Sequence, residues 1–286
     1  MRKTTILSLI IVLCLSLLTM SNAFADEEII RGELSEYDYL VSLKEMSAEE
    51  LKEGGFTDEE VKTIEDLDFE KMALEIKEIP DEELIGRGIT LDDIKIIRNT
   101  DDVGLILSKS LGNVTYNVSK VNFKKQGSNT YLKTKTTWNW STSPTLQLID
   151  IMATYTSDNF TKSSTSGSVT YYELGGNGVH ESSTVFTNFT RYAGRISCSR
   201  FPMNKVYPSS SNPSVDKRYY AKKGTIYNEW LASGNITVVG IACKYGHSTI
   251  SCTPSVSASV NSLSFSFTPS LSVTTGDEVY HQITRS

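Results

Sequence analysis

The sequence predicts an α+β fold with segregated parts, a small N-terminal helical module followed by an all-β antiparallel sandwich domain. Three observations predict it. Residues 26–102 carry 26 Asp and Glu against 9 Lys and Arg, a net charge of −17, whereas residues 103–286 carry a net charge of +9. The acidic part contains an internal repeat with a 33-residue offset. From Asn113 onward, apolar and polar residues alternate with the period of 2 that is typical of strands.

The first 25 residues predict an export signal. A short positive start precedes an apolar core at residues 6–18, and Ala23-Phe24-Ala25 has the small-x-small pattern of a signal peptidase site. We therefore expect cleavage between Ala25 and Asp26 and a mature protein that is secreted and extracellular. The rest of the chain has no apolar run of roughly 20 residues, the length that a spanning helix needs, which excludes a polytopic membrane protein.

The repeat in the acidic part aligns residues 33–65 with residues 66–98. Matching pairs include Leu34/Leu67, Lys44/Lys77, Leu51/Leu84 and Ile64/Ile97. Each copy predicts a helix, a glycine with positive φ that ends it, and a second helix that begins at a threonine N-cap. These glycine and threonine positions are Gly55 and Thr57 in the first copy and Gly88 and Thr90 in the second.

A helical pair repeated only twice is more typical of a docking module than of a catalytic domain, because two copies bury too little apolar surface to stand alone. We expect intramolecular docking between the acidic and the basic halves. The predicted division is a signal peptide at 1–25, the acidic helical module at 26–102, a linker at 103–112 and a Ser/Thr-rich β-sandwich at 113–286.

Two hairpins in the β half can be drawn with a register. Around His247-Ser248, Cys243 opposes Cys252; around Asn261-Ser262, Ala258 opposes Phe265. The second hairpin has one apolar face and one Ser/Thr face, which permits two interpretations. One is a sandwich sheet with one face on the core and one in water. The other is a membrane-inserting hairpin of a secreted pore-forming toxin, with the acidic half as its pro-region.

The mature chain has three cysteines, an odd number that leaves at least one thiol unpaired within a monomer. The predicted register permits a disulfide between Cys243 and Cys252, whereas thiols that fill space in the core are the alternative. The spacing of Cys243, His247 and Cys252 does not match a common zinc pattern, even with Cys198 as a fourth ligand. We expect neither a metal nor another cofactor.

The sequence lacks the motifs of common catalytic sites, among them the Gly-x-Ser-x-Gly elbow, the Walker loop and His-Glu-x-x-His. Asp150 interrupts an apolar run and is interpreted as a structural acceptor satisfied by hydrogen bonds. Glu181 follows His180, but adjacent strand residues point to opposite faces. We therefore expect a protein that is not an enzyme; an unrecognised carbohydrate-active enzyme with a carboxylate pair is an alternative.

Aromatic residues of the β half are candidate ligand contacts. Trp138 and Trp140 are two residues apart and share one face of a strand, and Tyr171 and Tyr219 add further rings that can stack on sugars. Core packing is the alternative for all four. The favoured function is non-catalytic extracellular binding or surface association, with a glycan or a cell-surface protein as partner. Scattered lysines beside an acidic half argue against nucleic acid, and membrane contact belongs only to the toxin alternative.

The segment Thr137-Trp138-Asn139-Trp140, together with Pro144, Asp150-Ile151 and Tyr245-Gly246-His247, resembles uncharacterised secreted proteins of Gram-positive-type bacteria. The helical repeat resembles segments that precede such domains. The resemblance implies a bacterial, extracellular setting, and it implies no activity and no catalytic residue.

Overall fold

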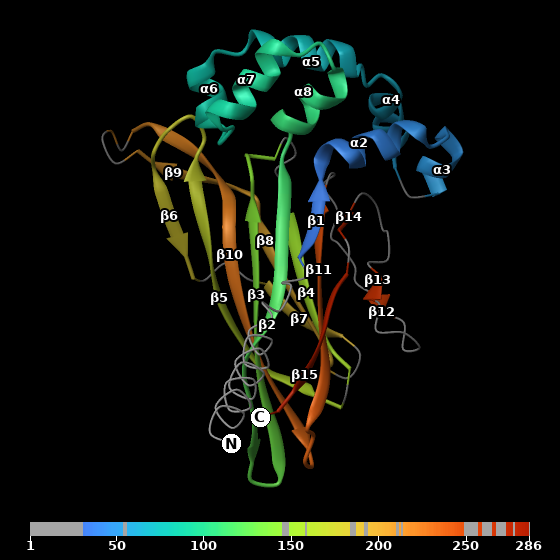
Figure 1. The fold of residues 1–286 in the computed structure, drawn as a ribbon, viewed down its shortest axis with the longest axis vertical. Coiled ribbons are helices and arrows are strands. Elements are labelled where there is room, and N and C mark those ends of the chain that lie inside the picture. Colours follow the sequence, from blue (N-terminus) through green and yellow to red (C-terminus); the bar gives the residue numbers. More distant parts are fainter. Residues whose placement is uncertain are drawn as a thin grey trace, which may run out of the picture. The chain divides into compact units, whose positions relative to one another are not determined.

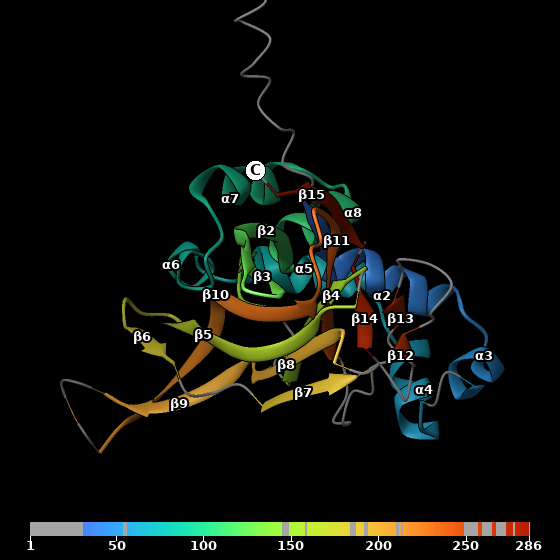
Figure 2. The same cartoon turned by 90° about the horizontal axis from the view of Figure 1, so that it is seen from below.

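Helices occupy the N-terminal part of the chain, and two antiparallel sheets that face each other occupy the rest (Figures 1 and 2). The predicted α+β class is confirmed at this level. The computed structural model describes residues 31–53, 56–144, 149–157, 159–183, 187–191, 194–209, 212, 214–248, 257–258, 265–266, 273–276 and 278–285. The described residues from Gly32 onward belong to one compact unit.

The described residues contain seven helices, and six of them fall into two sets with the same spacing. The bounds of α2 and α3 and the start of α4 recur 33 residues later in α5, α6 and α7, and α7 ends 34 residues after the end of α4. The helices are α2 Glu36–Glu45, α3 Ala48–Glu53, α4 Asp58–Glu65, α5 Phe69–Glu78, α6 Asp81–Gly86, α7 Leu91–Asn99 and α8 Val103–Ser110.

The turn between α6 and α7 has the backbone that the sequence predicts. Gly88 has φ +92°, a value that only glycine adopts without strain. The side chain of Thr90 accepts a hydrogen bond from the backbone N–H of Asp93 at 3.1 Å and caps the start of α7. Both predictions are confirmed for this copy. Gly55, the corresponding glycine of the first copy, lies outside the described residues.

Residues 103–110 form a helix, so the linker predicted at 103–112 is wrong over most of its length. The Asp102 side chain accepts from the N–H of Leu105 at 3.0 Å and caps this helix, α8. Ile106 and Leu107 are buried against α5 and α7 in the core of the helical module. Residues 103–110 are therefore a helix because their apolar side chains are buried in the helical module, although the sequence predicts a linker there.

The described strands form two large sheets and one two-stranded sheet. The seven-stranded sheet has the order β1-β2-β3-β10-β5-β6, with β9 paired to β10; the six-stranded sheet has the order β14-β11-β4-β8-β7, with β15 paired to β11. The first contains β1 Gly32–Ser35, β2 Asn113–Gln126, β3 Asn129–Trp140, β5 Thr161–Glu173, β6 Val179–Ser182, β9 Asn204–Pro208 and β10 Asp216–Ser233; the second contains β4 Ile149–Thr156, β7 Thr187–Arg191, β8 Ile196–Pro202, β11 Val238–Ser248, β14 Val273–Thr275 and β15 Val279–Thr284.

The helical module is an insertion between two neighbouring strands. β1 pairs with β2 so that Leu34 opposes Val114, and all seven helices lie between these strands in sequence (Figure 1). The backbone N–H of Glu36 donates to the carbonyl of Gly112 at 3.0 Å and brings the two ends of the insertion together. The boundary predicted between the helices and the sandwich is corrected accordingly, because residues 32–35 belong to the sheet.

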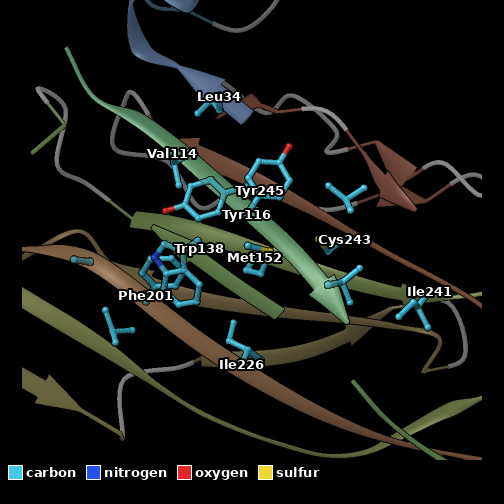
Figure 3. Close-up of a cluster of buried hydrophobic side chains, with 14 of the residues drawn as sticks. Leu34, Val114, Tyr116, Trp138, Met152, Phe201, Ile226, Ile241, Cys243 and Tyr245 are labelled. Atoms are coloured by element: carbon cyan, nitrogen blue, oxygen red, sulfur yellow. The ribbon is translucent and has the colours of Figure 1, made fainter. Parts of the chain in front are cut away.

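The core lies between the sheets and is rich in aromatic rings. Trp138 stacks on Phe201 with ring centres 4.4 Å apart, and Tyr116 stacks on Tyr245 at 5.8 Å (Figure 3). Leu34 of β1 belongs to the same cluster, so the strand before the insertion is anchored by burial as well as by backbone pairing. Such burial contributes about 1.5–3 kcal/mol for a fully buried large side chain.

A second hairpin pairs β12 Ser257–Ala258 with β13 Phe265–Ser266. Ala258 opposes Phe265 and Ser257 opposes Ser266, which is the register that the sequence predicts for the hairpin around Asn261-Ser262. The prediction is confirmed for these four residues.

A buried cluster of three ionisable side chains joins the start of the insertion to both strands at the centre of the second sheet. His247 of β11 places Nδ1 at 2.8 Å from Asp150 Oδ1 on β4 and Nε2 at 3.5 Å from Glu36 Oε1 on α2. All three are at most 3% exposed. Glu36 Oε2 also accepts from the N–H of Gly112 at 2.9 Å.

Tyr245 completes the polar network around Asp150. Its hydroxyl donates to Asp150 Oδ2 at 2.6 Å and accepts from the indole N–H of Trp140 at 3.0 Å. Asp150 is thus the structural acceptor that the sequence predicts. Burial by itself lowers the pKa of His247, but the Asp150 carboxylate and then Glu36 outweigh burial and raise this pKa to about 10. His247 is therefore an imidazolium at neutral pH.

The ion cluster predicts a loss of stability in alkali. The folded-state pKa of His247 is raised from 6.5 to about 10, so its stabilising contribution is complete below pH 6.5 and is lost as the pH rises toward 10. We expect the variant H247Q to unfold with a free energy lower by about 3–5 kcal/mol at pH 6, because it leaves two buried carboxylates without their cation. The same variant should lack this alkaline loss.

The measurement is urea-induced unfolding at pH 6, 8 and 10. H281Q, on β15 and outside the ion cluster, is the matched control and should keep the wild-type pH dependence. If the free energy of unfolding depends on pH equally in H247Q and in the wild type, the alkaline loss of stability does not come from His247.

Candidate functional site

The four aromatic residues that the sequence offers as ligand contacts are all buried. Trp138, Trp140, Tyr171 and Tyr219 are 2%, 0%, 0% and 3% exposed. The rings of Trp138 and Trp140 are engaged with Phe201 and Tyr245 in the core, and Tyr171 donates its hydroxyl to the carbonyl of Pro202 at 2.9 Å. None of these rings presents a free face for a sugar, so the proposed direct contact through them is corrected. Strand alternation correctly placed Trp138 and Trp140 on one face, and that face is turned into the core, which was the alternative interpretation.

The predicted register between Cys243 and Cys252 is also corrected. In β11, Cys243 lies between Thr154 of β4 and Val279 of β15, so both edges of the strand are occupied at that position. The C-terminal strand β15 takes the place that the hairpin partner would need. Cys243 is a buried free thiol, and burial raises its pKa, which argues against a nucleophilic role. Cys252 lies outside the described residues, as do Ala25 and Asp26 of the predicted cleavage site.

The strands β5, β6, β9 and β10 lie together in one part of the first sheet (Figure 1). Aromatic and charged side chains of these strands form a partly exposed group, which we call the His180–Tyr207 cluster. The rings of His180 on β6 and Tyr207 on β9 are almost parallel, with 12° between their planes and 4.3 Å between their centres. The buried ring of Tyr219 meets both rings edge-on, at 4.8 and 5.3 Å. The cluster comprises Glu173, His180, Lys205, Tyr207, Lys217 and Tyr219.

Strand register explains why these residues share a face. His180 opposes Tyr171, Tyr219 opposes both Glu173 and Lys205, and Tyr207 opposes Lys217. On this shared face, Tyr171 and Tyr219 are buried, whereas His180 and Tyr207 are partly exposed.

Glu173 is the carboxylate of the cluster, and it is held firmly in its charged form. Its Oε1 pairs with the Lys217 ammonium, and its Oε2 accepts from the N–H of Gly178 at 3.0 Å. The bond to Lys217 is the largest influence, and these contacts lower the pKa of Glu173 against the opposing effect of burial. A Cβ on Gly178 would lie 2.4 Å from that same Oε2, so only glycine allows the turn to approach the carboxylate.

The arrangement can bind a flat or ring-shaped molecule through aromatic faces with ionic groups beside them. In the sequence, His180 stands out only through its neighbour Glu181, and the alternation of strand faces correctly separates those two. What sequence reasoning missed is the contact with Tyr207, which depends on how β6 and β9 flank the pair β5 and β10. The candidates Tyr171 and Tyr219 are a partial sequence signal for the cluster, because they lie on β5 and β10, two of the strands that form it.

A cleft of about 520 Å³ lies between the helical module and the loops of the sandwich. Two backbone hydrogen bonds join the sandwich loops to the helical module. The N–H of Ser143 donates to the carbonyl of Arg87, and the N–H of Gly175 donates to the carbonyl of Gly86. Arg87 and Glu83 at the rim pair with each other at 2.7 Å, which neutralises the charge there. The apolar lining consists of Ile76, Leu84, Ile89, Leu111, Pro144 and Leu174. The cleft therefore offers a ligand less polar recognition than the His180–Tyr207 cluster does.

Within the described residues, no group of three or more His, Cys, Asp or Glu side chains is arranged to hold a metal ion. In the same part of the chain, no helix combines the length and apolar character that crossing a membrane requires.

No family model and no curated protein matches the chain. Several solved structures are similar at low identity. AvmM, which catalyses macrocyclization in alchivemycin A biosynthesis, is 9% identical, has a TM-score of 0.24, and is matched over 59% of this chain and 90% of its own. The collagen-binding domain of the Erysipelothrix rhusiopathiae surface protein RspB is 7% identical, with a TM-score of 0.24 and coverage of 59% and 64%. Clostridium perfringens delta-toxin is 8% identical, with a TM-score of 0.19 and coverage of 61% and 84%. At these TM-scores the similarities carry no inference about function.

Proposed function

We propose that the chain is a secreted, non-catalytic binding protein that recognises an extracellular glycan through the His180–Tyr207 cluster. One observation carries the proposal: two nearly parallel, partly exposed rings are supported from below by a buried tyrosine and flanked by ionic groups. Sugar rings present apolar C–H faces and polar edges, which such a surface complements. The export signal predicted at 1–25 supports the extracellular setting.

The state of the carboxylates supports binding over catalysis. Hydrolysis of a glycosidic bond commonly uses two carboxyl groups, one of which must be able to donate a proton. Glu173 is paired with Lys217 and its pKa is lowered, so it is a poor proton donor at neutral pH. Asp150, the other acid that stands out in the sequence, is 0% exposed and engaged by His247 and Tyr245.

The helical module is proposed to consist of two copies of one structural unit that dock on the sandwich. The support is the 33-residue recurrence of helix starts from α2–α4 to α5–α7, together with the sequence matches between the copies. The insertion of both copies between β1 and β2 places them beside one end of the sheet that carries the cluster. In this proposal the module has a structural role and the cluster binds the ligand.

Replacing the outer tyrosine tests the proposed site. We expect Y207A to weaken glycan binding at least about tenfold, because the variant loses the ring face and its stacking on His180. The measurement is fluorescence on a glycan array, followed by titration with the glycan that binds best. Y227A is the matched control: Tyr227 is also partly exposed and lies under a lysine, Lys133, at 5.4 Å, but outside the cluster. Equal binding by Y207A and Y227A would refute the assignment.

The paired backbone of β12 and β13 supports a second candidate, the membrane-active toxin. In the sequence, Ala258 belongs to the apolar alternation and Ser257 to the Ser/Thr alternation that an amphipathic membrane hairpin needs, and the backbone pairs Ala258 with Phe265. Cutting the chain after residue 102 is a poor test, because it also removes β1 and Glu36 from the sandwich. The full chain is therefore the proper material.

Dye release from liposomes tests this candidate. If the hairpin inserts, the full chain should release dye, A258D should abolish release because a charge on the lipid face costs about 2–4 kcal/mol, and S257D should retain it. Absence of release by the wild-type chain at micromolar concentration, with or without prior proteolysis, would count against the toxin. So would equal activity of the two variants.

A further inference from the structure

Lys205 is the lysine of the His180–Tyr207 cluster that forms no salt bridge with a described carboxylate. Its Nζ lies 5.0 Å from the ring centre of Tyr171 and 5.8 Å from that of Tyr207. Its hydrogen-bond partner is the hydroxyl of Ser182, at 3.4 Å. Two aromatic faces and a neutral oxygen therefore hold this ammonium in place beside the partly exposed rings of His180 and Tyr207.

The charges of the cluster do not balance. Lys217 is neutralised by Glu173. Among the residues that the structure describes, Lys205 forms no salt bridge, so the cluster has one positive charge in excess. Contact with aromatic faces stabilises an ammonium group less than a paired carboxylate does, and it leaves the cation able to receive an anion.

The Lys205 ammonium lies next to the stacked rings of His180 and Tyr207. Tyr207 is both the ring that Lys205 approaches and the ring that stacks on His180. A sugar lying against the exposed aromatic surface would bring the substituents at its edge toward the ammonium group. A neutral sugar would leave this cation unpaired, whereas a sugar with an acidic substituent would pair with it.

We propose that the His180–Tyr207 cluster takes an acidic glycan, one whose pyranose ring carries an anionic group that pairs with the Lys205 ammonium. The inference rests on the proposed function and adds the ligand class to it. A carboxylate and a sulfate ester present the same chemistry to a lysine, which acts as a point charge without the planar fork of arginine. The experiment distinguishes these two sources.

Isothermal titration of the full chain measures the contribution of the anion directly. The probes are a hyaluronan oligosaccharide, the same oligosaccharide with its carboxyl groups reduced to alcohols, and a carboxyl-reduced chondroitin sulfate oligosaccharide of equal length, whose only anions are sulfate esters. We expect the carboxyl-reduced hyaluronan to bind about tenfold more weakly than the parent, because it loses one charge-assisted contact. Preference for the sulfated or for the carboxylated probe identifies which anion the site takes.

Variants of Lys205 assign the effect to this residue. K205M should bind the parent and the carboxyl-reduced hyaluronan with equal affinity, whereas K205R should retain the preference for the parent because it keeps the charge. K124M is the matched control, since Lys124 lies over Tyr131 at 5.5 Å away from the cluster. Circular dichroism of each variant checks folding, and K205R keeps the test informative if K205M does not fold.

The outcomes separate the inference from the proposed function. If acidic and neutral probes bind equally and Y207A still abolishes binding, the site is a glycan site without acidic preference, and the inference is overturned while the function stands. If Y207A leaves binding of every probe unchanged, the proposed function itself fails. If K205M keeps the preference for the acidic probe, another cation is responsible and the inference is overturned.

Discussion

The ion cluster of Glu36, His247 and Asp150 is the constraint on which the arrangement of helices and sheets depends. Three ionisable groups at most 3% exposed are tolerated only because each has a partner, with His247 between the two carboxylates. Two of them come from the sandwich and one from the first residue of α2. The first helix must therefore begin at this place on the sandwich for the charges to be satisfied, and Gly112 brings the end of the insertion to the same point.

Burial decides which polar cluster can meet a ligand. The groups around His247 have the composition of a catalytic centre, but Trp140 and Tyr245 enclose them and their role is structural. The His180–Tyr207 cluster lies at the other edge of the first sheet, where β6 and β9 flank the long strands and leave the rings partly exposed. The same residue types are enclosed in one place and partly accessible to solvent in the other.

Features that depend on nearby residues could be predicted from the sequence. The N-cap at Thr90, the positive φ of Gly88 and the pairing of Ala258 with Phe265 involve positions at most seven residues apart. The position of Cys243 between Thr154 and Val279 could not be predicted, because its partners lie 89 and 36 residues away. The predicted linker failed for a related reason: α8 is helical because its apolar residues are buried against α5 and α7, and composition alone does not show that contact.

The sequence by itself determined the division into an acidic helical part and an alternating β part, the 33-residue offset of the sequence repeat, and the absence of common catalytic motifs, since charge, period and motif are local properties of the chain. Only the tertiary structure decided that β1 belongs to the sheet, that the helices are an insertion, that the candidate tryptophans point inward, and that His180 meets Tyr207. Each of these depends on which strand lies beside which, and strand alternation specifies two faces without specifying which one the core covers.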